Sequence, residues 1–195
     1  MAELTLPATE DQIRKLQVGA NLELTGRMIT GRDAAHKWLL EEVRREVAEY
    51  LEGSVIYHCG PVVQKQDDGS WRFVAAGPTT SIREEPYQAE VIERYGLRGV
   101  IGKGGMGPKT LAGLANSGAL YLHAVGGAAQ VLARAVSRVE RVFMLEEFGV
   151  PEALWVIEVE RFPVMVTMDA HGNSLHDSIE RQSRTELERL LSVPV

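Results

Sequence analysis

The sequence predicts an α/β fold, in which strands and helices mix along the whole chain. Short apolar segments with strand character alternate with segments whose apolar residues recur at helical spacing. Glycine-rich turns separate these segments, and no low-complexity stretch or linker divides the chain. With 195 residues and 45% hydrophobic content, the chain can build a substantial core. We therefore expect a single domain over residues 1–195.

The first half of the chain predicts four strands and three helices. In order, we expect a strand at 4–6, a helix at 9–16, a strand at 21–29, a helix that opens within 30–37 and runs to about 51, strands at 54–58 and 71–75, and a helix at 86–95. The second helix is predicted because its apolar residues recur at helical spacing, which would bury one face. These residues are Trp38, Leu39, Val43, Val47 and Leu51. Residues 64–70 are polar and predict a turn.

The second half continues the same mixture of strands and helices. In order, we expect an apolar strand through 100–101, a helix at 108–116, a strand at 119–124, a glycine turn at 126–127, a helix at 128–136, strands at 141–145, 154–160 and 164–168, a turn at 169–173 and a helix at 174–191. Charges alternate on a helical period along the last helix. This pattern allows for two sheets.

The segment 98–109 is the most unusual part of the sequence. It places four glycines within six residues, with Lys103 among them, between a short strand and a helix start. Such a turn brings backbone N–H groups up to an anion, and Gly102, Gly104 and Gly105 would let the backbone approach closely. From 94 to 139 there is no Asp or Glu, in a chain of net charge −6. The segment therefore predicts a site for a small anion.

Two nucleotide-binding motifs compete for the same glycines. The run 102–107 fits G-x-G-x-x-G, but the acidic residue expected about twenty positions later is absent. The P-loop requires Ser or Thr after Gly-Lys, and Gly104 stands there instead. A non-enzymatic module that binds an anion or a nucleotide phosphate stays open as an alternative function.

Composition limits the partners and the compartment. A pI near 5.4 argues against nucleic acid, and without a signal peptide or an apolar run of about 20 residues we expect no membrane association. Cys59 is the only cysteine, which predicts a buried side chain in a reducing, cytoplasmic compartment. One thiolate cannot hold an iron–sulfur cluster, and the five histidines lack ligand spacing, so we expect no metal site in this chain.

Three polar clusters lie at predicted strand ends or helix starts, where ligands gather in α/β folds. They are 31–33, 78–83 and 102–104. Their three cations, Arg32, Arg83 and Lys103, would suit a dicarboxylate, because guanidinium pairs a carboxylate through two bonds. As alternatives, Arg32 would pair with Asp33 at the helix start. Arg83 would pair with Glu84 or Glu85 at the surface.

The motifs become specific in combination. The set consists of 30–37, Gly60-Pro61, 77–80 with Arg83, 102–106 and 126–128. In this order and spacing it resembles the beta subunit of the class I, iron–sulfur-dependent fumarate hydratases and L(+)-tartrate dehydratases, from about residue 3 to about residue 185. The resemblance implies a swivelling β/β/α domain with three layers and mixed sheets.

The resemblance also implies a partner and an activity. In the family, an alpha subunit or a fused N-terminal domain carries a [4Fe–4S] cluster, so this chain would act only with that subunit, as an α2β2 heteromer. The reaction would be the reversible elimination of water from (S)-malate to give fumarate, with L(+)-tartrate as the alternative substrate. A noncatalytic assembly domain is a further possibility.

The family's functional residues can be carried over to matching positions. Arg32, Arg83 and Lys103 would hold the substrate carboxylates, Thr79 would move the carbon-bound proton, and Asp33, Gly102, Gly104 and Gly105 would support the loops. Threonine is a poor base when free, so its surroundings must activate it. Many members have Arg-Met-Asp where this chain has Arg83-Glu84-Glu85. The longer acid changes how it could orient Arg83.

Overall fold

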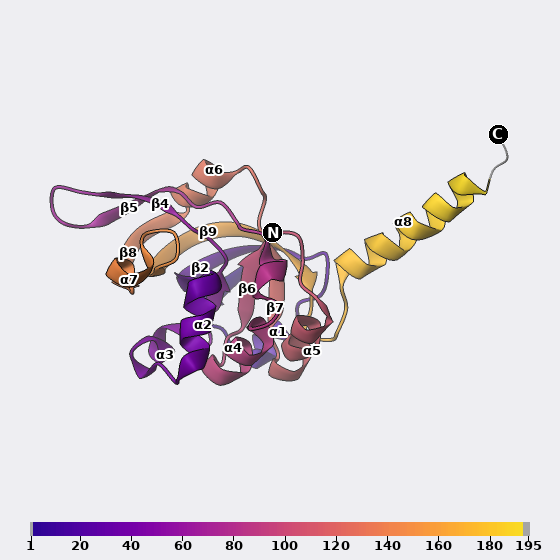
Figure 1. Ribbon diagram of the computed structural model, residues 1–195, viewed down its shortest axis with the longest axis horizontal. Helices are drawn as coiled ribbons and strands as arrows, with labels where there is room; N and C mark the ends of the chain where they lie inside the picture. Colours follow the sequence, from indigo (N-terminus) through magenta and orange to yellow (C-terminus); the bar gives the residue numbers. More distant parts are fainter. Residues whose placement is uncertain (1, 193–195) are drawn as a thin grey trace.

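The computed structural model describes residues 2–192 of the chain. Its strands are β1 (Ala2–Leu6), β2 (Asn21–Thr30), β3 (Val55–Tyr57), β4 (Val62–Lys65), β5 (Trp71–Ala75), β6 (Gly99–Gly102), β7 (Leu120–His123), β8 (Val136–Phe143) and β9 (Leu154–Met168). Its helices are α1 (Glu10–Ile13), α2 (Asp33–Glu41), α3 (Arg45–Leu51), the 3-10 turn η1 (Ser81–Glu84), α4 (Gln88–Tyr95), α5 (Pro108–Ser117), α6 (Ala129–Arg134), α7 (Leu145–Phe148) and α8 (Leu175–Leu191). The predicted α/β class is confirmed (Figure 1).

The larger sheet has seven strands in the order β1-β2-β3-β6-β7-β9-β8. Strands β1, β2, β3, β6 and β7 are parallel to one another, and β9 runs antiparallel to β2, β7 and β8. Because β9 also pairs with β2, the strands β2, β3, β6, β7 and β9 close into a ring. The hairpin β4–β5 forms a separate small sheet.

The protein has three layers, two of strands and one of helices, and a hydrophobic core lies between each pair of adjacent layers. Val55 and Tyr57 of β3 belong to the core between the strand layers, which also contains Trp155. Ile56, between them, faces the other core together with Leu39 of α2. Successive residues of a strand point to opposite faces, so this short strand is buried on both sides. Helices α2, α3, α4 and α5 cover the outer face of the second core (Figure 1).

The parallel strands determine where the polar loops meet. The carboxyl ends of β2, β3, β6 and β7 lie at one edge of the sheet, because these strands are neighbours and run in the same direction. The chain leaves this edge at Arg32, Cys59, Lys103 and Gly126. Loops that are far apart in the sequence are therefore brought together at the edge where α/β folds bind ligands.

The single long helix predicted through residue 51 is wrong. The structure has two helices, α2 and α3, and Glu42 at the end of α2 has an extended backbone. Val43, predicted to be buried, is 60% exposed, whereas Val47 and Leu51 are buried as predicted. The helical spacing of the apolar residues continues through the break, so the local pattern gives no sign of it.

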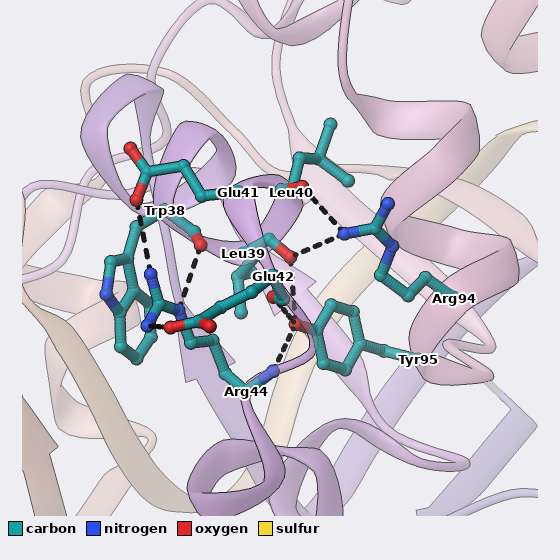
Figure 2. Close-up of polar contacts among 8 residues, drawn as sticks. All are labelled: Trp38, Leu39, Leu40, Glu41, Glu42, Arg44, Arg94 and Tyr95. Carbon is teal, nitrogen blue, oxygen red and sulfur yellow. Dashed lines mark hydrogen bonds and ion pairs between the residues drawn. The ribbon is translucent and has the colours of Figure 1, made fainter.

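Side chains from α4 stabilise the break (Figure 2). The last carbonyls of a helix lack partners within the helix. Tyr95 Oη donates to the Leu39 carbonyl at 2.8 Å and accepts the Arg44 N–H at 3.0 Å. Arg94 Nη1 donates to the Leu40 carbonyl at 2.7 Å. Arg44 Nε donates to the Trp38 carbonyl at 3.2 Å, so the end of α2 is satisfied by tertiary contacts.

Replacing Tyr95 with phenylalanine is expected to lower the free energy of unfolding by about 1–2 kcal/mol, because a buried carbonyl and a backbone N–H both lose a partner. Urea unfolding of the full chain measures the loss. Tyr87→Phe, at the start of α4, is the matched control and is expected to unfold like wild type. Equal midpoints for the two variants would contradict the role of Tyr95.

Other boundaries differ because strands pair over long distances. β9 is one strand of 15 residues, whereas the sequence predicted two. It bends at Arg161, where φ is 52°, and β2 pairs with both halves, with Leu22 opposite Val164 and Met28 opposite Ile157. β8 begins at 136 and not 141, because β9 pairs along it. The hairpin with β5 extends β4 into the predicted polar turn.

The last helix is confirmed and projects from the body of the protein (Figure 1). The Ser174 hydroxyl caps it by accepting the Asp177 N–H at 3.2 Å. None of its described residues is buried. No helix in residues 2–192 combines the length and apolar content needed to cross a bilayer.

Candidate active site

The four predicted contact residues all lie on loops at the carboxyl edge of the sheet. Arg32 is the N-cap of α2, Arg83 lies in η1, and Lys103 follows β6. Thr79 and Lys103 are joined directly, because the Lys103 N–H donates to the Thr79 carbonyl at 3.2 Å. The Ser81 N–H donates to the Lys103 carbonyl at 3.0 Å, so the segment around Thr79 continues the sheet beside β6.

Thr79 is anchored to the end of β3. Its N–H and its Oγ1 both donate to the carbonyl of His58, at 2.7 Å and 3.0 Å. The hydroxyl therefore bonds back to the strand and does not cap the following turn η1. Its proton points at a carbonyl, so its lone pairs are free for another group. Within residues 2–192 no carboxylate or imidazole is hydrogen-bonded to this hydroxyl, so the group that would activate it was not found in this chain.

Arg32 pairs with an acid that the sequence did not indicate. Its Nη1 lies 3.2 Å from Glu152 Oε1, and the predicted pairing with Asp33 is not formed. The other oxygen of Glu152 accepts the Ala34 N–H at 3.1 Å, at the start of α2. Glu152 therefore fixes both the arginine and the helix start. It lies about 120 residues from Arg32 in a turn without a motif, so no local signal could have identified it.

Arg83 is the more exposed of the two arginines. Its Nη1 lies 4.0 Å from Asp33 Oδ2, and its Nε donates to the Thr80 carbonyl at 3.4 Å. The predicted surface pairing with Glu84 or Glu85 is wrong. An exposed pair at this distance contributes little to stability, so Arg83 can turn to another carboxylate at small cost.

Glu84 is a fully buried acid beside this cluster. Its two oxygens have no hydrogen-bond partner among the described residues. Burial, together with the neighbouring Asp33, raises the pKa of Glu84 to about 8. This shift favours the neutral form of Glu84 near pH 7.

Replacing Glu84 with glutamine is expected to flatten the dependence of stability on pH. The pKa of an unfolded glutamate is 4.5, so between that value and about 8 the folded chain holds a proton that the unfolded chain has released. Stability of the wild type therefore falls as pH rises through this window, and the variant cannot titrate. Urea unfolding at about pH 5 and about pH 8 measures the difference. If the stability of wild type and of Glu84→Gln fell equally with pH, the prediction would be contradicted. The control is Glu93→Gln, at an exposed glutamate, which should keep the pH dependence of the wild type.

The glycine loop holds an anion that belongs to the chain itself. One Glu85 oxygen accepts the Gly107 N–H at 2.8 Å, and the other accepts the Lys109 and Thr110 N–H groups at 2.9 Å and 3.1 Å. The Thr110 hydroxyl adds a bond of 2.6 Å. Since Pro108 has no N–H, the first turn of α5 keeps no free donor for a phosphate. This geometry weakens the nucleotide alternative.

The other glycines of the loop are required by space and backbone geometry. A Cβ on Gly102 would lie 1.8 Å from Ser81 Oγ. Gly104 and Gly105 have φ of 84° and 80°, which side chains rarely tolerate. The Lys103 side chain extends toward Gly126, and it forms no ion pair within the described part of the chain. Among the three cations of the site, Lys103 is therefore the one without an ion-pair partner in the described residues.

The chain's own residues do not fit an iron–sulfur cluster. Cys59 is free and buried, and burial raises the pKa of its thiol to about 12. Such a thiol is a poor ligand, because the thiolate is the form that binds metal. Residues 2–192 contain no group of three or more His, Cys, Asp or Glu side chains that could hold a metal ion.

A buried chain of polar side chains under these loops was missed from the sequence. Its members are His36, Gln88, His58, Ser81 and Tyr121, all with zero exposure. His36 Nε2 and His58 Nε2 lie 2.9 Å and 2.8 Å from Gln88 Oε1. His58 Nδ1 and Tyr121 Oη both lie 2.9 Å from Ser81 Oγ. These residues lie on five different elements and share no spacing, so only the folded chain reveals them.

Comparison with known proteins agrees with this architecture. The model of the family Fumarase C-terminus matches residues 1–179. A protein of Geobacillus stearothermophilus that bears the provisional name fumarate hydratase class I is 51% identical over 186 residues, which cover 95% of this chain and 35% of that protein. The chain therefore spans about a third of that relative's length.

Two further relatives are of similar length to this chain. The L(+)-tartrate dehydratase subunit beta of Escherichia coli K12 is 41% identical over 88% of this chain and 85% of its own length. A protein of Methanocaldococcus jannaschii that bears the same name provisionally is 38% identical, over 95% of this chain and 96% of its own length. With a family match over nearly the whole chain and relatives above 30% identity, the chain belongs to the Fumarase C-terminus family, whose named members here are hydro-lyases.

Proposed function

We propose that this chain is the beta subunit of a [4Fe–4S]-dependent hydro-lyase that interconverts (S)-malate and fumarate by reversible elimination of water. The observation that carries the proposal is the meeting of Arg32, Thr79, Arg83 and Lys103 on loops at one edge of the sheet. This set offers cations for two carboxylates and a positioned hydroxyl near them.

Charge at this edge favours a dianionic substrate. Lys103 forms no ion pair within residues 2–192. Its ammonium group can therefore bind a substrate carboxylate without breaking an existing pair. Arg83 reaches Asp33 only at 4.0 Å and can exchange that contact for a second carboxylate. Arg32 stays paired with Glu152 through Nη1 and would bind a carboxylate through Nη2.

Thr79 would relay the carbon-bound proton: its oxygen would accept that proton while its own hydroxyl proton passes to a base supplied from outside the described residues, and the cations would stabilise the charge that develops on the adjacent carboxylate. Its hydroxyl is held by the His58 carbonyl, which fixes the direction of the oxygen lone pairs. A partner alpha subunit would carry the cluster, whose open iron supplies the Lewis acid for the leaving hydroxyl. This division explains why Cys59 is buried and unsuited to bind metal.

The same edge offers a surface for that partner. Ile82, next to Arg83 in the chain, is 50% exposed, and Val125, next to Gly126, is 63% exposed. In this proposal the partner would cover these two side chains at the rim of the site. We propose an α2β2 assembly in the cytoplasm, with the substrate between the two kinds of subunit.

L(+)-tartrate is the second candidate substrate, because two relatives of this length bear that name. Both diacids present two carboxylates and a hydroxyl, so the same clamp would serve either one.

We expect the chain alone to show no hydro-lyase activity, and the reconstituted pair to convert malate to fumarate. The test is anaerobic iron–sulfur reconstitution of the chain with and without the alpha subunit, followed by fumarate absorbance. Turnover by the isolated chain would overturn the two-subunit proposal. Formation of oxaloacetate from tartrate, without fumarate from malate, would replace the first substrate by the second.

A further inference from the structure

We propose that the buried chain His36–Gln88–His58–Ser81–Tyr121 positions Thr79 and Arg32, and that Gln88 donates both amide N–H groups to the two imidazoles. Each imidazole then carries a single proton, on Nδ1. The positioning role rests on the proposed function, whereas the proton arrangement concerns the folded chain alone.

The buried chain touches each of the loops that carry the candidate site. The backbone carbonyl of His58 accepts both bonds from Thr79, so the place of this residue sets the direction of the Thr79 hydroxyl. The Arg32 carbonyl accepts from the His36 N–H at 2.9 Å and contacts His36 Nδ1 at 2.8 Å. Ser81 Oγ fills the space over Gly102, next to Lys103. One set of side chains therefore connects three loops.

The proton positions follow from His36. A carbonyl oxygen only accepts, so the contact with the Arg32 carbonyl requires a proton on His36 Nδ1. If the Gln88 oxygen also faced His36 Nε2, that nitrogen would need a proton too, and the ring would be a cation with no exposure to solvent. The Gln88 nitrogen would meanwhile be buried without an acceptor. Both consequences are costly.

Exchanging the two ends of the amide removes both costs. The ends have the same shape, and only the hydrogen-bond network distinguishes them. The amide nitrogen has two N–H groups, one for each imidazole Nε2, and the unpaired atom becomes a carbonyl oxygen, which is the less costly group to leave unsatisfied. Burial also lowers the pKa of His36 and of His58, which agrees with two neutral rings.

The remaining hydrogen bonds of the buried chain converge on Ser81 Oγ. His58 Nδ1–H donates to Ser81 Oγ, which also accepts from Tyr121 Oη through its second lone pair. Since each Nε2 accepts from Gln88, neither ring has a free lone pair to take a proton from Thr79. The histidines are therefore positioning residues and not the base that activates the hydroxyl.

The proton arrangement is tested by 15N NMR of the imidazoles in the full chain, which needs neither partner nor cluster. We expect His36 and His58 to show the neutral Nδ1–H tautomer from about pH 5.5 to about pH 8, without titrating. An imidazolium signal from His36 at neutral pH, or an Nε2–H tautomer in either ring, would overturn the assignment.

Gln88→Glu gives a second test, because a carboxylate keeps the shape and loses both donors. If Gln88 donates, this variant should place a new proton on Nε2 of both rings, which turns His36 into an imidazolium, and should lower the urea midpoint relative to Gln130→Glu, an exposed matched control. If Gln88 accepts from an imidazolium, the carboxylate should instead preserve the signals and raise the midpoint, which would refute the proposal.

The positioning role is tested by Ser81→Ala in the reconstituted pair. We expect kcat to fall by about tenfold or more through misplacement of Thr79, with KM for malate changed by less than about twofold. The control is Ser54→Ala, which removes a buried hydroxyl that donates to the Arg27 carbonyl at 2.7 Å and should keep wild-type kcat. If Ser81→Ala kept the wild-type kcat, the positioning role would be refuted and the proposed function would stand. If the wild-type pair itself were inactive, the proposed function would be refuted.

Discussion

Replacing Thr79 with valine is expected to lower kcat of the reconstituted two-subunit enzyme by about 10²-fold or more, the usual effect of removing a positioned acid–base group. Valine keeps the volume and the branching at Cβ, and the Thr79 N–H still donates to the His58 carbonyl at 2.7 Å. The loop should therefore stay in place. KM for malate should change little, because Arg32, Arg83 and Lys103 would still hold both carboxylates. Steady-state kinetics with malate measure both parameters.

Two other variants make the Thr79 result interpretable. Lys103→Ala should mainly raise KM, because a charge contact serves the bound substrate and the transition state alike. Thr25→Val is the matched control: its hydroxyl also bonds to the backbone, accepting the Arg161 N–H at 3.1 Å, but it lies in β2 away from the site. A Thr79→Val enzyme that unfolds earlier yet turns over at the wild-type rate would exclude Thr79 from proton transfer.

The part of the site that the sequence predicts is the part determined locally. Arg32 directly precedes α2 and Lys103 directly follows β6, and those boundaries depend on periodicity and on glycine, whereas Thr79 was assigned through the family resemblance alone. Once the strands are parallel neighbours, their ends must meet at one edge. The class of the fold and the place of the candidate site were therefore accessible without coordinates.

The missed features depend on residues far apart in the sequence. The break after Glu42 is stabilised by Arg94 and Tyr95, about fifty residues away, and the apolar spacing through Val43 gives no hint of it. The partner of Arg32 is Glu152, in a turn without a motif. Side chains that satisfy a helix end or an ion pair from another element leave no periodic trace, so their identity requires the tertiary structure.

Glu85 shows how tertiary contacts change the meaning of a motif. The glycine loop and helix start predicted a site for a small anion, and the structure fills the helix start with the chain's own carboxylate. The relevant acid lies 22 residues before Gly107, where the sequence suggested only a partner for Arg83. The sequence motif that predicts ligand binding therefore forms a helix cap within the chain at the start of α5.

Replacing Glu85 with alanine is expected to lower the free energy of unfolding by about 3 kcal/mol, because four donors at the start of α5 lose a charged acceptor. Glu85→Asp keeps a carboxyl group but is shorter by one methylene. It should retain only part of the bonds and give an intermediate loss. Urea unfolding of the full chain measures both variants.

The control for this series is Glu93→Ala, an exposed acid of α4 outside the cap, which should unfold close to wild type. High salt separates the two contributions of the cap. The favourable charge at the helix N-terminus is screened, whereas the hydrogen bonds of a half-buried carboxylate persist, so most of the loss should remain at high ionic strength. If Glu85→Ala unfolds at the same urea concentration as Glu93→Ala, the carboxylate does not hold the start of α5, and the donors there are free to bind an external anion.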